Sequence, residues 1–243
     1  FDVFVFVSHW QKNAFMKKYN LPPRKCFVIK NAIDIAEESG EKFDNLEKIK
    51  LVYTSTPQRG LNILYEVFKE LKNIFPNRLE LNVFSSFDLY GERHKVRNEA
   101  YNNLFEKLKS DKDVNYHGSV DHEELIKNLN DQHIWCLPSI WQETSCISLM
   151  EAMSSKCICI HSDLAALPET SANFSVMYPF DERINEHALA FYDAIATTIQ
   201  LLIQNPENFK KHLAFQKLYF DIYYNWSVRA REWTLLLQSS LSK

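Results

Sequence analysis

The chain has 243 residues, of which 46% are hydrophobic and 24% charged, a balance typical of one large globular domain or of one domain plus a fragment. Its 28 Lys and Arg against 31 Asp and Glu give a formal net charge of -3, which argues against a dedicated nucleic-acid binder. Only four residues are glycine, and neither G-x-G-x-x-G nor G-x-x-x-x-G-K-[ST] occurs, so dehydrogenases and P-loop NTPases are poor candidates.

Short apolar runs alternate with amphipathic stretches along the chain. The expected strands are Val3–Val7, Cys26–Ile29, Lys50–Tyr53, Leu79–Phe84, Val114–Tyr116, His133–Leu137, Cys157–His161 and Ser175–Tyr178. The expected helices are Gln11–Tyr19, Leu61–Ile74, Lys95–Leu108, Glu123–Leu129, Ser145–Met153 and Ala188–Gln204, with only helix from Pro206 onward, ending in Trp226–Leu241. This alternation predicts an α/β fold in which crossover helices connect a parallel sheet.

The first residues are apolar, but they have neither a basic leading region nor a cleavage site, and they predict a strand rather than a signal peptide. Because the chain opens in a strand and without methionine, we expect a fragment of a longer protein. No run of 18 or more apolar residues occurs, which predicts no membrane-spanning helix.

Opposite charges are separated near the start of the chain. Residues 3–33 hold six basic residues and no acidic one, whereas residues 34–47 hold six acidic residues around Lys42. One interpretation is a solvated linker after a basic helix. The other is a patch for anionic lipid heads or phosphates, made of Lys12, Lys17, Lys18, Arg24 and Lys25. The sequence leaves both open.

The cysteines show no disulfide or metal framework. They are Cys26, Cys136, Cys146, Cys157 and Cys159, without a C-x-x-C motif or a metal-like pairing with histidine. We therefore expect buried thiols in a reducing cytoplasm and no bound metal.

The loops at the carboxyl ends of parallel strands are where ligands bind in an open sheet. These loops are Ser55–Gly60, Ser85–Gly91, His117–Asp121, Pro138–Ser145 and Ser162–Glu169. Arg59 is expected at a helix N-terminus, a position that favours an anion and so suggests a phosphate. Gly60 would let the backbone approach that ligand closely, and Asp121 would cap the following helix.

Two glutamates stand eight positions apart, Glu143 in a loop and Glu151 about two turns into the expected helix. Two turns rise about 11 Å, so the two carboxylates can flank a ligand that lies across the helix N-terminus. Carboxylates accept hydrogen bonds from the vicinal hydroxyls of ribose and hexose, while the amides of Ser145 to Ile147 would face an anion. By spacing alone, an N-terminal acid and an unrelated surface glutamate remain an equal alternative.

These residues resemble the family 4 nucleotide-sugar glycosyltransferases, which have the two-lobed B-type fold. Glu143 and Glu151 match their E-x7-E motif, with Pro138-Ser139 before it and Ala152-Met153 after it. Further similar segments are Ser8-His9-Trp10, Lys30-Asn31-Ala32-Ile33-Asp34, Arg59-Gly60, His117-Gly118-Ser119-Val120 and Leu167-Pro168-Glu169. The final helix with Trp226 resembles the one that crosses back to the N-terminal lobe. The resemblance covers nearly the whole chain, as the C-terminal, donor-binding lobe.

The resemblance implies a Rossmann-like parallel sheet with helices on both faces. It also implies that Glu151 holds the ribose hydroxyls, that Glu143 holds the sugar, and that Arg59 neutralises the diphosphate. With Glu143 and Arg59 as the catalytic pair, the donor-binding residues are Glu151, Ser119, Val120, Thr144, Ser145, Cys146 and Ile147. The substrates would be a nucleoside-diphosphate sugar and a glycan or glycoconjugate acceptor, with transfer by retention and without a metal or other cofactor. The product would be a surface polysaccharide or glycoconjugate.

The chain departs from the family pattern in places. The family's second basic residue is replaced by Ser55 or a neighbour, and its glycines after the first glutamate by Thr144 and Ser145. We expect three parts: 1–48, the end of the N-terminal lobe and a linker; 49–225, the nucleotide-sugar-binding domain; and 226–243, the helix that crosses back. With the acceptor lobe largely missing, this chain alone would be inactive.

Two other interpretations stay open. One is a non-catalytic nucleotide-sugar- or protein-binding module of the same fold. The other is a different B-type enzyme, such as an epimerase or a phosphorylase, although no recognisable lysine for pyridoxal phosphate is present. The expected location is the cytoplasm, with peripheral contact at the inner face of a membrane left open.

Overall fold

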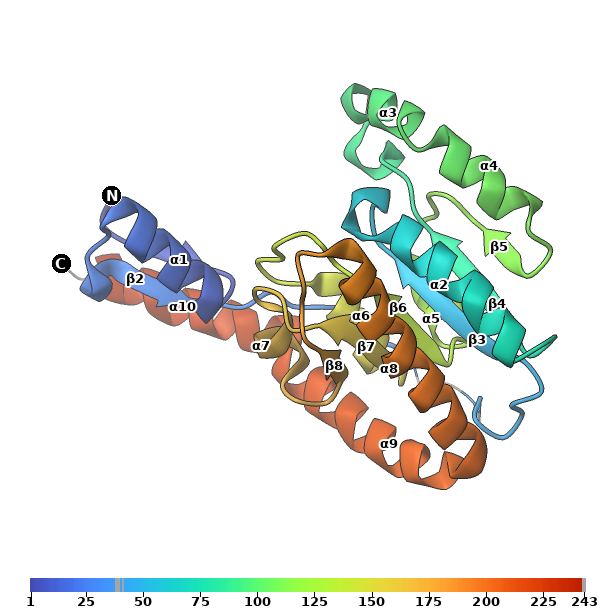
Figure 1. The fold of residues 1–243 in the computed structure, drawn as a ribbon. Helices are drawn as coiled ribbons and strands as arrows, with labels where there is room; N and C mark the ends of the chain where they lie inside the picture. Colours follow the sequence, from blue (N-terminus) through green and yellow to red (C-terminus); the bar gives the residue numbers. More distant parts are fainter. Residues whose placement is uncertain (38–39, 41, 242–243) are drawn as a thin grey trace.

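The computed structural model describes residues 1–37, 40 and 42–241, and it contains two parallel sheets (Figure 1). The small sheet pairs β1 (Phe4–Phe6) with β2 (Cys26–Val28). The large sheet has six strands in the order β5-β4-β3-β6-β7-β8. Its strands are β3 (Ile49–Thr54), β4 (Leu79–Phe84), β5 (Val114–Tyr116), β6 (Ile134–Leu137), β7 (Ile158–Ser162) and β8 (Val176–Tyr178). The predicted α/β class and all eight expected strands are confirmed to within two residues at each end.

Helices cover both faces of the large sheet. The described helices are α1 (His9–Tyr19), α2 (Leu61–Ile74), α3 (Glu92–Glu99), α4 (Asn102–Ser110), α5 (His122–Leu129), α6 (Ile147–Ser154), α7 (Leu167–Ser171), α8 (Ile184–Gln204), α9 (Pro206–Tyr223) and α10 (Trp226–Leu241), of which α1 and α10 lie with the small sheet. The pair α2 and α8 packs together over the strands from β6 to β8, while α6 packs on β7 from the other face and against α9. None of the described helices is both long and apolar enough to cross a bilayer.

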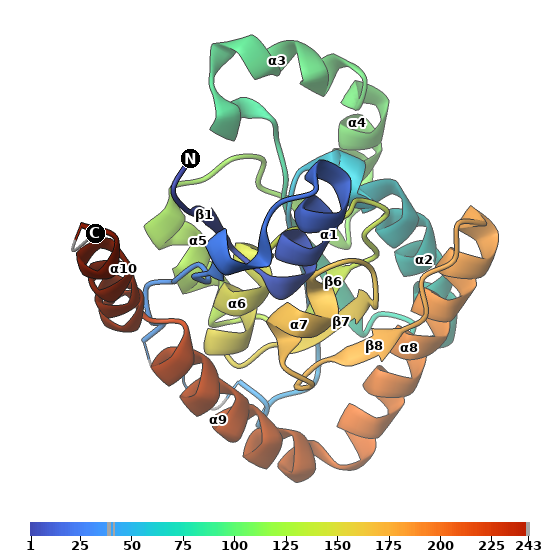
Figure 2. The ribbon, with the colours of Figure 1, turned by 90° about the vertical axis from the view of Figure 1, so that its left-hand side faces the viewer.

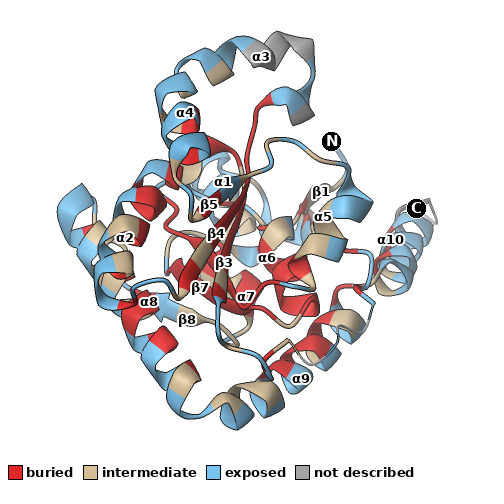
Figure 3. Cartoon of the chain, turned by 90° about the vertical axis from the view of Figure 1, so that its right-hand side faces the viewer, coloured by how far each residue is buried: buried red, intermediate tan, exposed pale blue. Residues whose placement is uncertain are grey.

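The central strands are buried on both faces, as parallel strands between two helix layers must be. Leu51, Leu81 and Trp135 have no exposed surface, and Figure 3 shows the burial concentrated in these strands. The five cysteines are buried and none forms a disulfide, as the sequence predicted.

The expectation of one helix over Lys95–Leu108 is wrong, because the helix is interrupted between α3 and α4. Tyr101 leaves the helical conformation, with φ −113° and ψ 2°, and its ring packs between Phe87 and Phe105. The Asn98 side chain accepts a hydrogen bond from the Phe87 amide at 2.9 Å. These tertiary contacts override a continuous helical pattern.

The small sheet, α1 and α10 form a second group of elements beside the large sheet (Figures 1 and 2). The first four amides of α1 all have hydrogen-bond acceptors. Ser8 accepts from the amides of Gln11 and Lys12. The Glu169 carboxylate of α7 accepts from the amides of His9 and Trp10, both at 3.0 Å. Helix α7 was not predicted, because its five residues are too few for a helical period to show.

Candidate functional site

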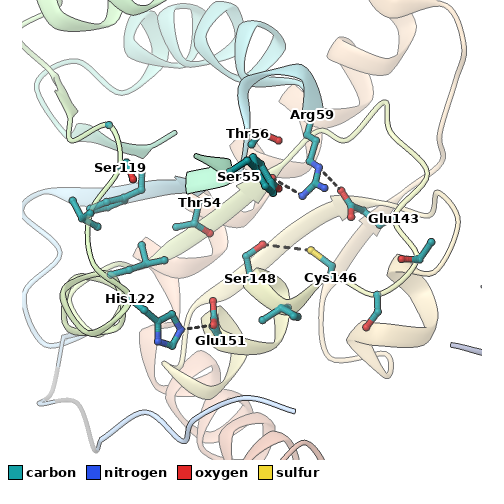
Figure 4. A pocket seen from close by; sticks show the side chains of 18 residues that line it. Thr54, Ser55, Thr56, Arg59, Ser119, His122, Glu143, Cys146, Ser148 and Glu151 are labelled. Atoms are coloured by element: carbon teal, nitrogen blue, oxygen red, sulfur yellow. Dashed lines mark hydrogen bonds and ion pairs between the residues drawn. The ribbon is translucent and has the colours of Figure 1, made fainter. Parts of the chain in front are cut away.

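In the large sheet, β4 and β5 follow on one side of β3, whereas β6, β7 and β8 follow on its other side, so the strand order reverses between β3 and β6. A cavity of about 430 Å³ opens at the carboxyl end of these two strands (Figure 4). Open α/β sheets bind ligands at this switch point. The cavity is lined by Thr54, Ser55, Thr56, Arg59, Phe84, Tyr90, Gly118, Ser119, Val120, His122, Leu125, Glu143, Thr144, Ser145, Cys146, Ile147, Ser148 and Glu151. All nine site residues that the sequence singled out are among them.

Four of the five expected loops reach this cavity. The fifth, Ser162–Glu169, contributes no lining residue. Its Glu169 instead contacts the start of α1 and lies 3.2 Å from Lys30 Nζ. Burial alone would raise the pKa of Glu169, but the hydrogen bonds from His9 and Trp10 and the charge of Lys30 lower it to about 2.

Arg59 and Glu143 come from the loops after β3 and β6 and point toward one another (Figure 4). Arg59 Nε lies 3.0 Å from Glu143 Oε1, and Arg59 Nη1 donates to Ser55 Oγ at 3.2 Å. Glu143 is only 5% exposed, and its backbone carbonyl accepts from Ala166 at 3.1 Å, which fixes the loop. Burial raises the pKa of Glu143, and the Arg59 guanidinium partly opposes this shift.

Arg59 lies at the N-terminus of α2, as the sequence suggested, directly before the N-cap residue Gly60. It ends a short 3₁₀ turn, Pro57–Arg59, and Gly60 then starts α2 with a φ of +103°. A Cβ at Gly60 would lie 2.1 Å from the Pro138 carbonyl oxygen. Gly60 therefore allows the β3 and β6 loops to pack on each other, and this packing brings Arg59 beside Glu143.

Glu151 lies one turn into α6, not two, because the helix begins at Ile147 rather than at Ser145. Its carboxylate is 6% exposed, and Oε1 lies 2.7 Å from His122 Nε2 at the start of α5. Burial raises the pKa of Glu151, and the hydrogen bond and charge of His122 lower it in part.

His122 lines the site although the sequence pattern did not single it out. It directly follows Asp121, the last residue of a loop already selected for its position after a strand, so its position in the chain was the one available signal. Asp121 is the N-cap residue of α5, yet its side chain makes no capping hydrogen bond.

The remaining predicted residues also line the cavity. Ser119 and Val120 come from the β5–α5 loop, and the segment from Thr144 to Ile147 leads into α6, whose N-cap Cys146 makes no side-chain capping bond. The first-turn amides of α6 are therefore open to a ligand. Thr56 Oγ1 and Ser145 Oγ are buried and have no hydrogen-bond partner among the described residues.

Within residues 1–37, 40 and 42–241, no group of three or more His, Cys, Asp or Glu side chains could hold a metal ion. The positive charge of the cavity comes from Arg59 and from the half-exposed His122 when it is protonated.

Comparison with known proteins gives both a family and a fold. The model of the family described as "Glycosyl transferases group 1" matches residues 33–214. A curated protein from Arabidopsis thaliana, named as a subunit of phosphatidylinositol N-acetylglucosaminyltransferase, is 28% identical over 172 residues, which are 69% of this chain and 36% of that protein. The chain thus spans about a third of the length of this relative.

Solved structures share the fold at low sequence identity. A glycosyltransferase from Rickettsia africae has a TM-score of 0.76 and 17% identity, with 99% of this chain and 64% of that chain covered. Sucrose-phosphate synthase from Thermosynechococcus elongatus has a TM-score of 0.75 and 14% identity, covering 98% and 58%. HepE from Anabaena, solved in complex with UDP-glucose, has a TM-score of 0.74 and 14% identity, covering 98% and 64%.

Proposed function

This chain belongs to the glycosyl transferases group 1 family, and on that premise we propose that it binds a nucleoside-diphosphate sugar for transfer, with retention, to a glycan or glycoconjugate. The observation that carries the proposal is the cavity at the switch point, which gathers one guanidinium and two buried carboxylates. The Anabaena neighbour with UDP-glucose supports it, as does the Arabidopsis relative with its N-acetylglucosaminyltransferase name.

Arg59 and the first amides of α6 serve the diphosphate in this proposal. The guanidinium offers charge and several N–H donors, and the uncapped helix start offers further donors. As the bond between sugar and diphosphate breaks, negative charge grows on the leaving phosphate. Donors fixed in a partly buried site stabilise that charge without having to reorganise.

The two carboxylates serve the hydroxyl-bearing ends of the donor. Glu151, beside the β5–α5 loop, would accept from the ribose, with Ser119 and Val120 along the base. Glu143, beside Arg59, would accept from the transferred sugar. An ionised carboxylate only accepts hydrogen bonds, so both positions select a ligand that carries hydroxyl donors there.

We further propose that donor binding needs no divalent cation, because Arg59 and the helix amides supply the counter-charge. The same proposal includes a glycan or glycoconjugate acceptor and the division of the chain into parts that end at residues 48 and 225. It also limits the activity of this chain to donor binding. The chain spans 36% of its curated relative, so transfer by the 243-residue chain alone is not expected.

A cytoplasmic location with peripheral membrane contact is also part of the proposal. Lys17 and Lys18 on α1 and Arg24 just before β2 are exposed and would meet anionic lipid heads. Sedimentation with phosphatidylglycerol vesicles, against vesicles of phosphatidylcholine only, tests this contact. Equal sedimentation with both would contradict it.

A non-catalytic binding module remains the second candidate, favoured by one observation. Where the family has its second basic residue, Ser55 accepts a hydrogen bond from Arg59. Such a module would bind its nucleotide but would never turn it over. A full-length protein that hydrolyses or transfers the sugar would exclude this candidate.

Calorimetry tests the proposal directly. UDP, GDP and ADP and their glucose conjugates are titrated into the chain with and without a chelator. We expect one nucleotide series to bind, equally well in both conditions. Glu106→Ala, which removes an exposed carboxylate on α4 that does not line the cavity, serves as the control and is expected to change nothing. Loss of binding on chelation would contradict metal independence, and no binding in any series would contradict the proposed function.

A further inference from the structure

The cavity has a charge arrangement that a diphosphate site alone does not explain. Among the described residues that line it, Arg59 is the only lysine or arginine. The carboxylate of Glu143 lies 3.0 Å from its Nε and offsets its charge before any ligand arrives. Glu151 adds a second buried carboxylate, paired with His122.

Arg59 and Glu143 lie close together, but part of their hydrogen-bonding capacity is unsatisfied. Neither Arg59 Nε nor Glu143 Oε1 makes an aligned hydrogen bond with a described residue, although 3.0 Å separates them. Arg59 Nη1 donates to Ser55, and no described residue accepts from Nη2. Glu143 is 5% exposed and lines the cavity, while its Oε1 is buried beside Arg59.

A bare nucleoside diphosphate meets this pair unfavourably. Its terminal phosphate brings a second anion to the guanidinium that Glu143 already neutralises, and in a partly buried site water screens this repulsion weakly. The phosphate also brings no hydroxyl donor for the Glu143 carboxylate. Part of the attraction of Arg59 for the phosphate is therefore cancelled.

A sugar-bearing donor meets the same pair differently. The bond to the sugar removes one ionisable oxygen from the terminal phosphate, which lowers the negative charge beside Glu143. The hydroxyls of the sugar can donate to Glu143 and disperse its charge, so that Arg59 is left for the diphosphate.

We propose that Glu143 makes this site discriminate between the sugar-bearing donor and the spent nucleoside diphosphate, by competing with the phosphate for Arg59 whenever no sugar is bound. This inference rests on the proposed function and goes beyond it, since it assigns to Glu143 the weakening of product binding. In the reaction, loss of the sugar restores the competition between the carboxylate and the phosphate and promotes release of the nucleotide.

The test compares Glu143→Gln with the unchanged chain in titrations with UDP, GDP and ADP and with their glucose conjugates. Glutamine keeps the shape and an acceptor oxygen but removes the charge. The variant is expected to bind the bare nucleotide about tenfold more tightly and the sugar nucleotide no more tightly, so the preference for the sugar nucleotide falls about tenfold. Glu143→Ala is also expected to bind the bare nucleotide more tightly than the unchanged chain does. It replaces Glu143→Gln if thermal melting shows that the latter does not fold.

Glu151→Gln is the matched control, because it removes the same charge from the same cavity at a position that is not paired with Arg59. It is expected to weaken the bare nucleotide rather than tighten it. If Glu143→Gln leaves the bare nucleotide unchanged or weaker, or if Glu151→Gln tightens it equally, this inference is overturned while the proposed function stands. If no nucleotide binds to any of these proteins, the proposed function fails and this inference fails with it.

Discussion

Gly60 and Pro138 are in backbone contact between the β3 and β6 loops, so close that a Cβ on Gly60 would lie 2.1 Å from the Pro138 carbonyl oxygen. The contact sets the spacing between the two loops that carry Arg59 and Glu143. The φ of +103° at Gly60 also suits glycine alone among common residues.

Gly60→Ala is expected to lower the free energy of unfolding by about 2–4 kcal/mol, because it adds both backbone strain and a clash with a backbone atom. It should also weaken nucleotide binding, since the loops must separate. Gly91→Ala is the control: Gly91 has a φ of +83° but no atom within 4 Å of the added Cβ. Denaturant unfolding of both variants checks this, and equal losses would show that strain alone accounts for the effect.

Glu169 is expected to make stability depend on pH in the acid range. Its pKa is lowered from 4.5 to about 2 in the folded chain. A depressed carboxyl pKa contributes stability that is present above the unfolded value and is lost as the pH falls through the folded one. The unchanged chain should therefore exceed Glu169→Gln in unfolding free energy by a constant, maximal amount above pH 4.5. This difference should shrink as the pH falls toward 2. A difference that stays constant over this range would contradict the assignment.

Glu151→Ala should weaken both the bare nucleotide and the sugar nucleotide, since the two share the ribose. Loss of a charged hydrogen bond corresponds to about 1.5–3 kcal/mol, or about 10- to 150-fold in affinity. Calorimetry with both ligands checks this. A loss confined to the sugar nucleotide would show that Glu151 contacts the sugar instead.

His122→Ala tests whether the histidine orients Glu151. His122 is half exposed, so a smaller loss than that of Glu151→Ala is expected, again for both ligands. The double variant should bind no worse than Glu151→Ala, because the two side chains act through one contact. Additive losses would mean that His122 contacts the nucleotide independently.

Ser55→Lys would place a second cation beside Arg59. It is expected to tighten binding of the bare diphosphate about 3- to 10-fold, by adding an ion contact in a partly exposed site. Ser55→Ala, which removes the hydrogen bond to Arg59 without adding charge, is the control. Equal behaviour of the two variants would show that the phosphate does not lie near this position.

The sequence was informative where the information is local. Each strand was visible as an apolar run, and the rule that ligands bind at the carboxyl ends of parallel strands selected the loops that hold Arg59, Ser119 and Glu143.

What the sequence could not show depends on contacts between distant segments. The pairing of Glu151 with His122 depends on the packing of α5 beside α6, and the role of Gly60 depends on a loop that follows a different strand. The break at Tyr101 depends on Phe87, which lies before α3. No local periodicity encodes these contacts, so they need the folded chain.

The capping of α1 has a consequence for the order in which the chain folds. The helix buries none of its own residues, and two of its first amides find their acceptor only in Glu169, 160 residues away from His9. An isolated helix of this length is marginal in water. We therefore expect α1 to become ordered late, after β7 and α7 have formed, and amide hydrogen exchange during refolding should show its protection appearing after that of the central strands.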